Sequence, residues 1–282
     1  MNTTEYLSKW AISYKDDIIN NIMPFWMKYG LDREHGGVYT CVNRDGSLMD
    51  TTKSVWFQGR FGFIAAYAYN NIEKNPQWLA ASKSCIDFIE AHCFDTDGHM
   101  FFEVTEDGKP LRKRRYVFSE GFAAIAMAEY ALATGEKEYA KKALDIFKRT
   151  LHFLNTPGFL EPKYLPTLPS RGHSITMILI NTASRIRMVI DDPSLTEQID
   201  TSIAALRKYF IHPEFKALLE MVGPDGEFID TCNGRVINPG HCIETAWFIM
   251  EEAKYRNWDK DLLQLALQIL DWSWEWGWDK EF

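Results

Sequence analysis

The sequence predicts an all-α fold, an α/α toroid with short β-hairpins between its helices. Two observations lead to this prediction: one plan of segments recurs about every sixty residues, and apolar helical segments alternate with striped ones. Repeated units of this kind cannot bury their own apolar faces and depend on their neighbours. The regular period therefore favours a toroid over an irregular helical bundle.

The repeated unit starts at four positions spaced by about sixty residues, namely Asp32, Asp95, Asn155 and Glu214. In three of the units a short alternating strand leads into an Asp-Gly turn, which is a strong hairpin signal. These three segments are 31–47, 94–110 and 212–228, and a plainer turn lies at 155–159.

Between the turns lie helical segments of two kinds. Segments that are apolar on nearly every side must be enclosed, and they are expected at 54–69, 117–132, 173–186 and 241–253. Segments with one charged face are expected to cover them, at 76–92, 136–154, 194–210 and 258–275. Inner helices ringed by outer helices are the arrangement of an α/α toroid.

The end of the sequence begins another unit. The residues WDKEF at 278–282 match LDREH at 31–35, and no inner helix follows. We therefore expect residues 1–282 to form a single toroid domain that is incomplete at its C-terminus.

Composition excludes several classes of function. Of the 282 residues, 46% are hydrophobic, and the formal net charge is −8 without a basic tail, which disfavours nucleic acid and anionic membranes as partners. There is no apolar run of bilayer-spanning length and no leader pattern. Five scattered cysteines without a CxxC pair indicate a reducing, cytoplasmic location. No second cluster accompanies the HC dipeptides, so no metal is expected.

Polar residues stand near the start of each apolar helix. Inner helices of a toroid run in the same direction, so their first turns share one rim. A polar ligand is expected there, because charge on such apolar helices is tolerated chiefly when paired or functional. Nearby aromatic faces suit a sugar. The residues are Arg60, Glu120, His173 and His241, with Trp56 and Tyr116 beside them.

Each of these residues also has a structural interpretation. Arg60 could pair with an inner acid, Glu120 could cap its helix, and His173 could lie exposed in a turn. His241 is the best candidate base, because a helix N-terminus disfavours the imidazolium and keeps the ring neutral. Glu244, one turn later, could hydrogen-bond the ring or pair with an arginine.

A histidine base beside an arginine suits proton abstraction next to a carbonyl, with the arginine stabilising the charge that develops on oxygen. The sequence contains no GxSxG, GxGxxG or GxxxxGK[ST] motif, so serine hydrolase, dinucleotide and P-loop sites are not indicated.

These motifs resemble a known family. The stretches FWMKYGLDREHGGVYTCVNRDGS, KSVWFQGR, RYVFSEGFAAIA, MILINTASRIR and NPGHCIETAWFIMEEA are similar to the N-acylglucosamine 2-epimerases, which include the renin-binding proteins. The similarity runs from about residue 20 to the C-terminus. It implies an (α/α)6 barrel and interconversion of N-acetylglucosamine and N-acetylmannosamine, by removal of the C2 proton of the open-chain sugar and its return on the opposite face.

The resemblance also implies roles for particular residues. His241 matches one of the family's two acid/base histidines, and Arg60 matches its essential substrate-binding arginine. Substrate-binding positions are expected at Trp56, Tyr116, Glu120, His173 and Glu244. No cofactor is required for the chemistry. The resemblance allows ATP as an allosteric activator, an amino sugar as the small-molecule partner and a homodimer as the assembly.

Three functions remain open at this point. The first is an epimerase or its truncated relative. The family's second acid/base histidine lies in the last third of longer members, and His173 could substitute for that histidine here. This first function includes another aldose 2-epimerase or an aldose–ketose isomerase, although those related proteins carry a histidine where this sequence reads TMILIN. A glycoside hydrolase would need two carboxylates from Glu120, Asp230 and Glu244. A non-catalytic sugar-binding protein is the third reading.

Overall fold

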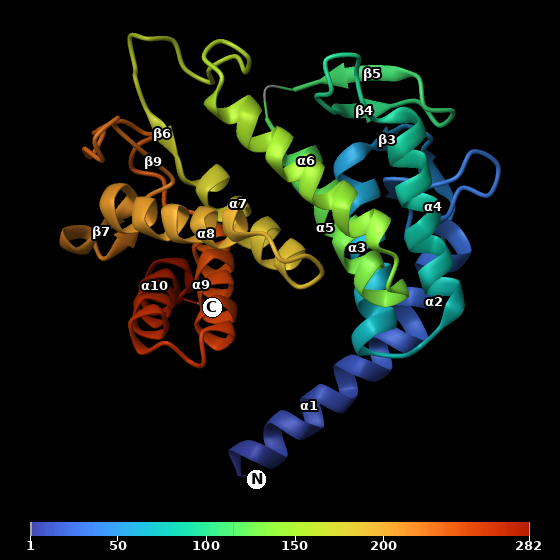
Figure 1. Ribbon diagram of the computed structural model, residues 1–282. Helices are drawn as coiled ribbons and strands as arrows, with labels where there is room; N and C mark the ends of the chain where they lie inside the picture. Colours follow the sequence, from blue (N-terminus) through green and yellow to red (C-terminus); the bar gives the residue numbers. More distant parts are fainter. Residues whose placement is uncertain (1, 115, 282) are drawn as a thin grey trace. The chain divides into compact units, whose positions relative to one another are not determined.

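The computed structural model describes residues 2–114 and 116–281, which form two compact units, Met1–Pro157 and Gly158–Phe282. Each unit is built mainly from helices, with short strands between them (Figure 1). The predicted all-α class with short hairpins is confirmed. That residues 1–282 form one toroid domain stays a prediction.

All four apolar segments and all four striped segments fold as helices close to the predicted bounds. The apolar segments form α3 (Val55–Asn71), α5 (Phe118–Thr134), α7 (His173–Arg187) and α9 (Pro239–Tyr255). The striped segments form α4 (Pro76–His92), α6 (Lys137–Asn155), α8 (Pro193–Ala205), which continues in the π-helical turn η3 (Leu206–Phe210), and α10 (Lys260–Gly277). In the first unit α3 packs on α4 and α5, and α5 packs on α6. In the second unit α7 packs on α8 and α9, and α9 packs on α10.

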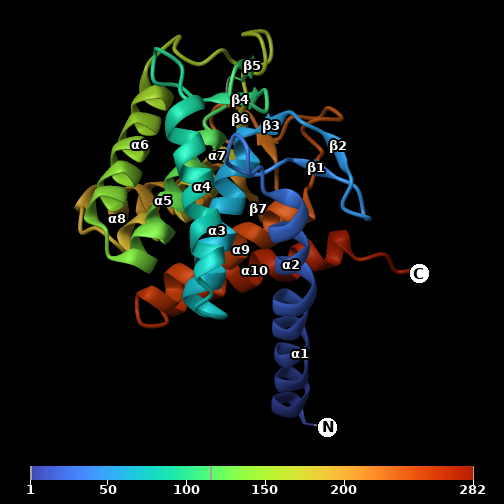
Figure 2. The ribbon, with the colours of Figure 1, turned by 90° about the vertical axis from the view of Figure 1, so that its right-hand side faces the viewer.

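The first unit also has an N-terminal arm that the repeat pattern did not predict. It runs through α1 (Thr3–Asp17), η1 (Ile18–Ile22), α2 (Met23–Phe25) and η2 (Trp26–Gly30). Helix α1 has no buried residue, and it extends away from the rest of its unit in both views (Figures 1 and 2). Met23 anchors the arm in a core cluster formed with Ala65, Ala68, Trp78 and Ala81.

Two of the three predicted hairpins form as expected. β1 (Cys41–Val42) pairs with β2 (Leu48–Asp50), and β4 (Phe101–Val104) pairs with β5 (Pro110–Lys113) and with β3 (Lys53–Ser54). Their turns place Gly46 at φ +88° and Gly108 at φ +87°, a left-handed conformation that glycine adopts without a steric penalty.

The third hairpin prediction is wrong in its pairing. β9 (Met221–Val222) does precede the Asp225–Gly226 turn, but it pairs with β6 (Arg171–Gly172), the two residues before α7. A separate small hairpin joins β7 (Ile211–His212) to β8 (Ala217–Leu218) through the 3₁₀ turn η4 (Pro213–Phe215). The β6–β9 pairing brings the start of α7 to the segment that precedes the turn.

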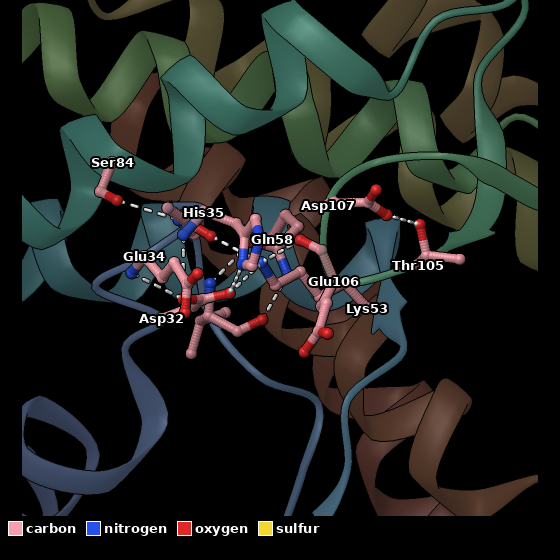
Figure 3. Close-up of polar contacts among 12 residues, drawn as sticks. Asp32, Glu34, His35, Lys53, Gln58, Ser84, Thr105, Glu106 and Asp107 are labelled. Atoms are coloured by element: carbon pink, nitrogen blue, oxygen red, sulfur yellow. Dashed lines mark hydrogen bonds and ion pairs between the residues drawn. The ribbon is translucent and has the colours of Figure 1, made fainter.

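A buried lysine joins the hairpins of the first unit to the start of α3 (Figure 3). Lys53 is fully buried, and its Nζ lies 2.7 Å from Asp32 Oδ2 and 2.8 Å from the carbonyl oxygens of Gly36 and Glu106. The ammonium also lies 4.2 Å from the ring centroid of Phe88. Every proton of the ammonium has an acceptor, so Lys53 is a structural residue.

The first turns of α3 and α5 use the same device to hold the preceding hairpin. Gln58 accepts a hydrogen bond from the Val38 N–H and donates to the Val38 carbonyl. Glu120 occupies the corresponding place in α5, where Oε1 accepts hydrogen bonds from the Met100 N–H at 2.7 Å and from His99 Nδ1 at 2.5 Å. Each side chain thus hydrogen-bonds the backbone of the preceding hairpin segment.

Close packing of α3 on α5 depends on small residues. A Cβ added to Gly59 would meet the backbone of Phe122 at 2.6 Å, so the two helices touch there. Ala123, Ala124 and Ala126 of α5 are fully buried. Arg60, one residue after the glycine, is consequently placed over the ring of Phe122.

Among the helices that the structure describes, none combines the length and apolar character needed to cross a bilayer.

Candidate functional site

His241 stands in the first turn of α9. Asn238 caps this helix, because its side chain accepts a hydrogen bond from the backbone N–H of His241. The imidazole is partly accessible, with 37% of the side chain exposed. Its Nδ1 lies 3.0 Å and 3.2 Å from the two carboxylate oxygens of Glu220. The capped helix start thus holds the backbone of His241, and a carboxylate holds its ring.

Glu220 lies between β8 and β9 and is fixed by its backbone. Its carbonyl accepts a hydrogen bond from the N–H of His173 at 3.0 Å, and its own N–H donates to the Val236 carbonyl at 3.3 Å. The carboxylate then faces two histidines, since His173 Nδ1 lies 3.6 Å from Oε2. We refer to His173, Glu220 and His241 as the imidazole–carboxylate cluster.

His173 opens α7 and is fully buried, which corrects the interpretation that it lies exposed in a turn. The β6–β9 pairing covers it on one side, and the ring of Phe210 packs edge-on at 5.8 Å on another. Its Nε2 lies 2.9 Å from the hydroxyl oxygen of Thr245, which in turn lies 2.8 Å from the carbonyl oxygen of His241. His173 is therefore held by the hydrogen bond of its Nε2 and by burial, and its Nδ1 faces the Glu220 carboxylate.

Electrostatics in the cluster favour the ionised carboxylate. Burial alone would raise the pKa of Glu220, but the facing His173 ring and the hydrogen bond from His241 outweigh it and lower the pKa to about 2. The hydrogen bond that His241 donates to Glu220 raises the pKa of His241, against the opposing effect of burial, and the charges of Glu220 and Glu244 add to the increase. The helix N-terminus was expected to keep His241 neutral. The Glu220 carboxylate, which the sequence did not reveal, acts in the opposite direction.

The three side chains of the cluster also carry donor atoms of the kind that bind cations. One donor atom from each lies within 4.8 Å of the others, a grouping that the sequence spacing did not reveal. However, the contact of 3.0 Å between His241 Nδ1 and Glu220 is that of an ordinary charge-assisted hydrogen bond. We assign no metal to the cluster.

The predicted aromatic and arginine positions lie in the first unit. Arg60 is exposed on α3, and its guanidinium carbon lies 4.2 Å from the centroid of the Phe122 ring and 6.0 Å from that of Trp56. Trp56 is half-buried and contacts Phe122, and Tyr116 is half-buried against Phe118. Arg60, Trp56 and Tyr116 thus belong to one cluster at the first turns of α3 and α5.

Glu120 and Glu244 differ in the contacts they make. Glu120 is only 1% exposed, and Oε1 is occupied by the Met100 N–H and by His99, as a structural residue would be. Glu244 is half-buried on α9, one turn after His241, and acts on that ring through its charge. Their substrate-binding roles stay predictions, as does the approach of Arg60 to His241, which lies in the other unit.

Sequence reasoning missed Glu220. One signal could have found it: a single charged residue interrupts the otherwise apolar run ALLEMV at 217–222, and a buried acid in such a run needs a partner. The partners, His173 and His241, lie 47 and 21 residues away along the chain, so only the folded structure identifies them.

Comparison with known proteins places the chain in a family. The family model described as N-acylglucosamine 2-epimerase (GlcNAc 2-epimerase) matches residues 37–282. The chain belongs to this family. It is 29% identical to the N-acylglucosamine 2-epimerase of Rattus norvegicus over 93% of this chain and 64% of the rat protein. It is also 29% identical to the Homo sapiens N-acylglucosamine 2-epimerase, over 82% of this chain and 56% of the human protein.

Solved structures agree on the fold. The cellobiose 2-epimerase of Bacillus thermoamylovorans superposes with a TM-score of 0.82 and 20% sequence identity, over 95% of this chain and 72% of that protein. The fold class is therefore that of the epimerase α/α toroids. This chain spans less than two thirds of the length of the rat and human relatives.

Proposed function

We propose that this chain catalyses, or forms part of a protein that catalyses, 2-epimerisation of an N-acyl amino sugar, interconverting N-acetylglucosamine and N-acetylmannosamine. Membership of the epimerase family supports this proposal. The observation that carries it is the imidazole of His241, which is partly accessible and whose Nδ1 is engaged by Glu220. Because a carboxylate only accepts hydrogen bonds, Nδ1 carries a proton and Nε2 of the neutral ring is left as the base.

In the proposed step the sugar is in its open-chain aldehyde form. The C2–H bond breaks, the proton moves to Nε2 of His241, and the electron pair forms the C1=C2 bond of an enolate. Arg60 would stabilise the negative charge on the aldehyde oxygen, as a guanidinium does for developing oxyanions. Return of a proton to the opposite face of C2 gives the epimer. Because His173 is fully buried, His241 is the better candidate for the first proton transfer.

Isotope exchange tests this proposal without requiring net epimerisation. In D₂O the wild-type chain should exchange the C2 proton of N-acetylmannosamine for deuterium, measured as loss of the C2–H proton NMR signal. His241→Asn should reduce the exchange roughly 10²- to 10⁴-fold, the usual contribution of a general base. His212→Gln is the matched control, since His212 also pairs with a glutamate in the same unit. Equal exchange in wild type and H241N would refute the assignment of the base.

The choice of sugar can be tested in the same way. Cellobiose and mannose should exchange more slowly than N-acetylmannosamine if the chain belongs to the N-acyl branch. The contacts of the described acids give no support to a glycoside hydrolase: Glu120 is buried with Oε1 bound to its own hairpin, and Asp230 is exposed and paired with Arg235.

Three finer properties complete the proposal. The five cysteines are free, which supports a reducing, cytoplasmic location. By resemblance to the family we propose a homodimer, to be tested by light scattering. On the same basis we propose activation by ATP without a cofactor in the chemistry, to be tested by adding ATP to the exchange assay.

A further inference from the structure

We propose that Glu220 is the positioning residue for His241, and that His173 holds the other side of the same carboxylate so that Glu220 can perform this role. The inference rests on the proposed function, in which His241 is the base. It assigns to Glu220 and His173 the task of fixing the tautomer and the orientation of the His241 ring.

The first step concerns the tautomer. Both oxygens of Glu220 lie within hydrogen-bonding distance of His241 Nδ1, at 3.0 and 3.2 Å. An ionised carboxylate has only acceptor sites, so Nδ1 must donate. The neutral imidazole then carries its single proton on Nδ1, and the lone pair lies on Nε2. The opposite tautomer would place two lone pairs against each other and could not accept a proton at Nε2.

The second step concerns what holds the carboxylate. The side chain of Glu220 is 24% exposed and would have several rotamers if only His241 contacted it. His173 limits them, because its backbone N–H donates to the Glu220 carbonyl at 3.0 Å and its Nδ1 lies 3.6 Å from Oε2. The two rings lie with centroids 6.4 Å apart, and the Nδ1 atoms of both face Oε2 of the acid. His173 is itself fully buried and cannot turn away.

The third step concerns charge. The ionisable groups that face the His241 ring are Glu220 from the β8–β9 segment, His173 from α7 and Glu244 from its own helix. When the ring accepts a proton from substrate, the imidazolium forms beside the Glu220 carboxylate, which stabilises it. A neutral residue of the same shape would remove this stabilisation and would leave the packing almost unchanged.

The test compares Glu220→Gln with Glu220→Asp, which keeps the charge on a shorter side chain. Long-range ¹H–¹⁵N correlation spectra of the ¹⁵N-histidine-labelled full chain report the tautomer and the titration midpoint of His241 in the absence of sugar. In wild type we expect the Nδ1–H tautomer. In E220Q we expect a mixture of tautomers and a lower midpoint, and in E220D a return toward wild type. The matched control is Glu214→Gln, which disrupts the His212–Glu214 pair and should leave His241 unchanged.

The same variants are then measured by C2 exchange across pH. The inference predicts that E220Q lowers the exchange rate by about 10²-fold or more and moves the acidic limb of the pH–rate profile, which reports deprotonation of the base, to lower pH. An unchanged tautomer and midpoint in folded E220Q, or the Nε2–H tautomer in wild type, would overturn it. If E220Q does not fold, the inference requires a shifted His241 midpoint in E220D and is overturned without one.

The two proposals fail in different ways. If the spectra behave as expected but the wild-type chain exchanges no C2 proton, the proposed function fails and the positioning of the ring stands. If the wild type exchanges and E220Q does so equally fast, the positioning role is refuted and the proposed function stands.

Discussion

Removing the buried ammonium of Lys53 should destabilise the first unit strongly. We consider Lys53→Met, which preserves most of the side-chain volume. The substitution leaves the buried Asp32 carboxylate without its counter-charge, and it removes the hydrogen-bond donor of the Gly36 and Glu106 carbonyls. Breaking a buried ion pair by removing one partner typically costs about 3–5 kcal/mol. This is a large part of the ~5–15 kcal/mol that stabilises a typical domain.

The pKa of Asp32 gives an independent magnitude. Burial would raise this pKa, but the hydrogen bond from Lys53, together with the backbone N–H groups of His35 and Glu34, lowers it from 3.8 to about 2. A difference of that size between the folded and unfolded chain corresponds to roughly 2 kcal/mol of stabilisation. Because the folded pKa is depressed, this contribution is present above pH 4 and is lost as the pH falls toward 2.

Urea unfolding followed by circular dichroism at pH 7 and at pH 3 is the appropriate assay. The unfolding free energy of K53M should be about 3–5 kcal/mol below wild type at pH 7, and the gap should narrow at pH 3. Lys109→Met is the matched control: Lys109 pairs with Asp107 in the same hairpin region but is exposed, so stability should not change. A difference in unfolding free energy between wild type and K53M below about 1 kcal/mol at pH 7, or a difference that does not depend on pH, would refute this account of Lys53.

Three further predictions concern the candidate site. Arg60→Lys should reduce C2 exchange roughly 10²-fold at constant melting temperature, since an ammonium replaces the guanidinium that can bind an oxyanion with two hydrogen bonds; exchange within twofold of wild type would contradict this. Glu120→Gln should lower the unfolding free energy by about 1–3 kcal/mol through the contacts to Met100 and His99. Burial lowers the pKa of His99, but the bond to Glu120 outweighs this and raises it, so the stabilisation is complete below pH 6.5 and is lost as the pH rises through the folded pKa. The unfolding free energies of wild type and E120Q, measured by urea titration from pH 6 to 9, should therefore converge as the pH rises. A loss of C2 exchange at unchanged stability would instead indicate that Glu120 binds substrate. Finally, EDTA should leave C2 exchange unaffected, and a loss of exchange that Zn²⁺ restores would place a metal in the cluster.

The elements of the fold were largely accessible from the sequence, because they depend on local patterns. Continuous apolar segments and striped segments differ in hydrophobic periodicity, and the observed helices follow that difference closely. The hairpin prediction failed at the Asp225–Gly226 turn, although its sequence is as strong a hairpin signal as Asp107–Gly108. A turn motif specifies that the chain reverses direction but not which strands pair beside the turn. Here β9 pairs with β6.

The candidate site was predictable only in part, because its parts come from distant segments. His241 could be singled out as a costly polar residue at a helix start. Its partner could not be identified: the sequence offered Glu244, one helical turn away, as a residue that could bond the ring or pair with an arginine, whereas the carboxylate on Nδ1 comes from Glu220. His173 was found as a residue but with the wrong environment, since its burial depends on the β6–β9 pairing.

The short β6–β9 ladder has a consequence for the order in which the protein becomes competent. It joins Gly172 to Met221 and thereby closes a loop of about 50 residues, which costs entropy before any contact is gained. On the ribosome, His173 emerges long before the segment that will cover it. The ladder and the capped start of α9 must both form before the proposed base is in place, so chemical competence should follow the closure of this loop and not the formation of α7 alone.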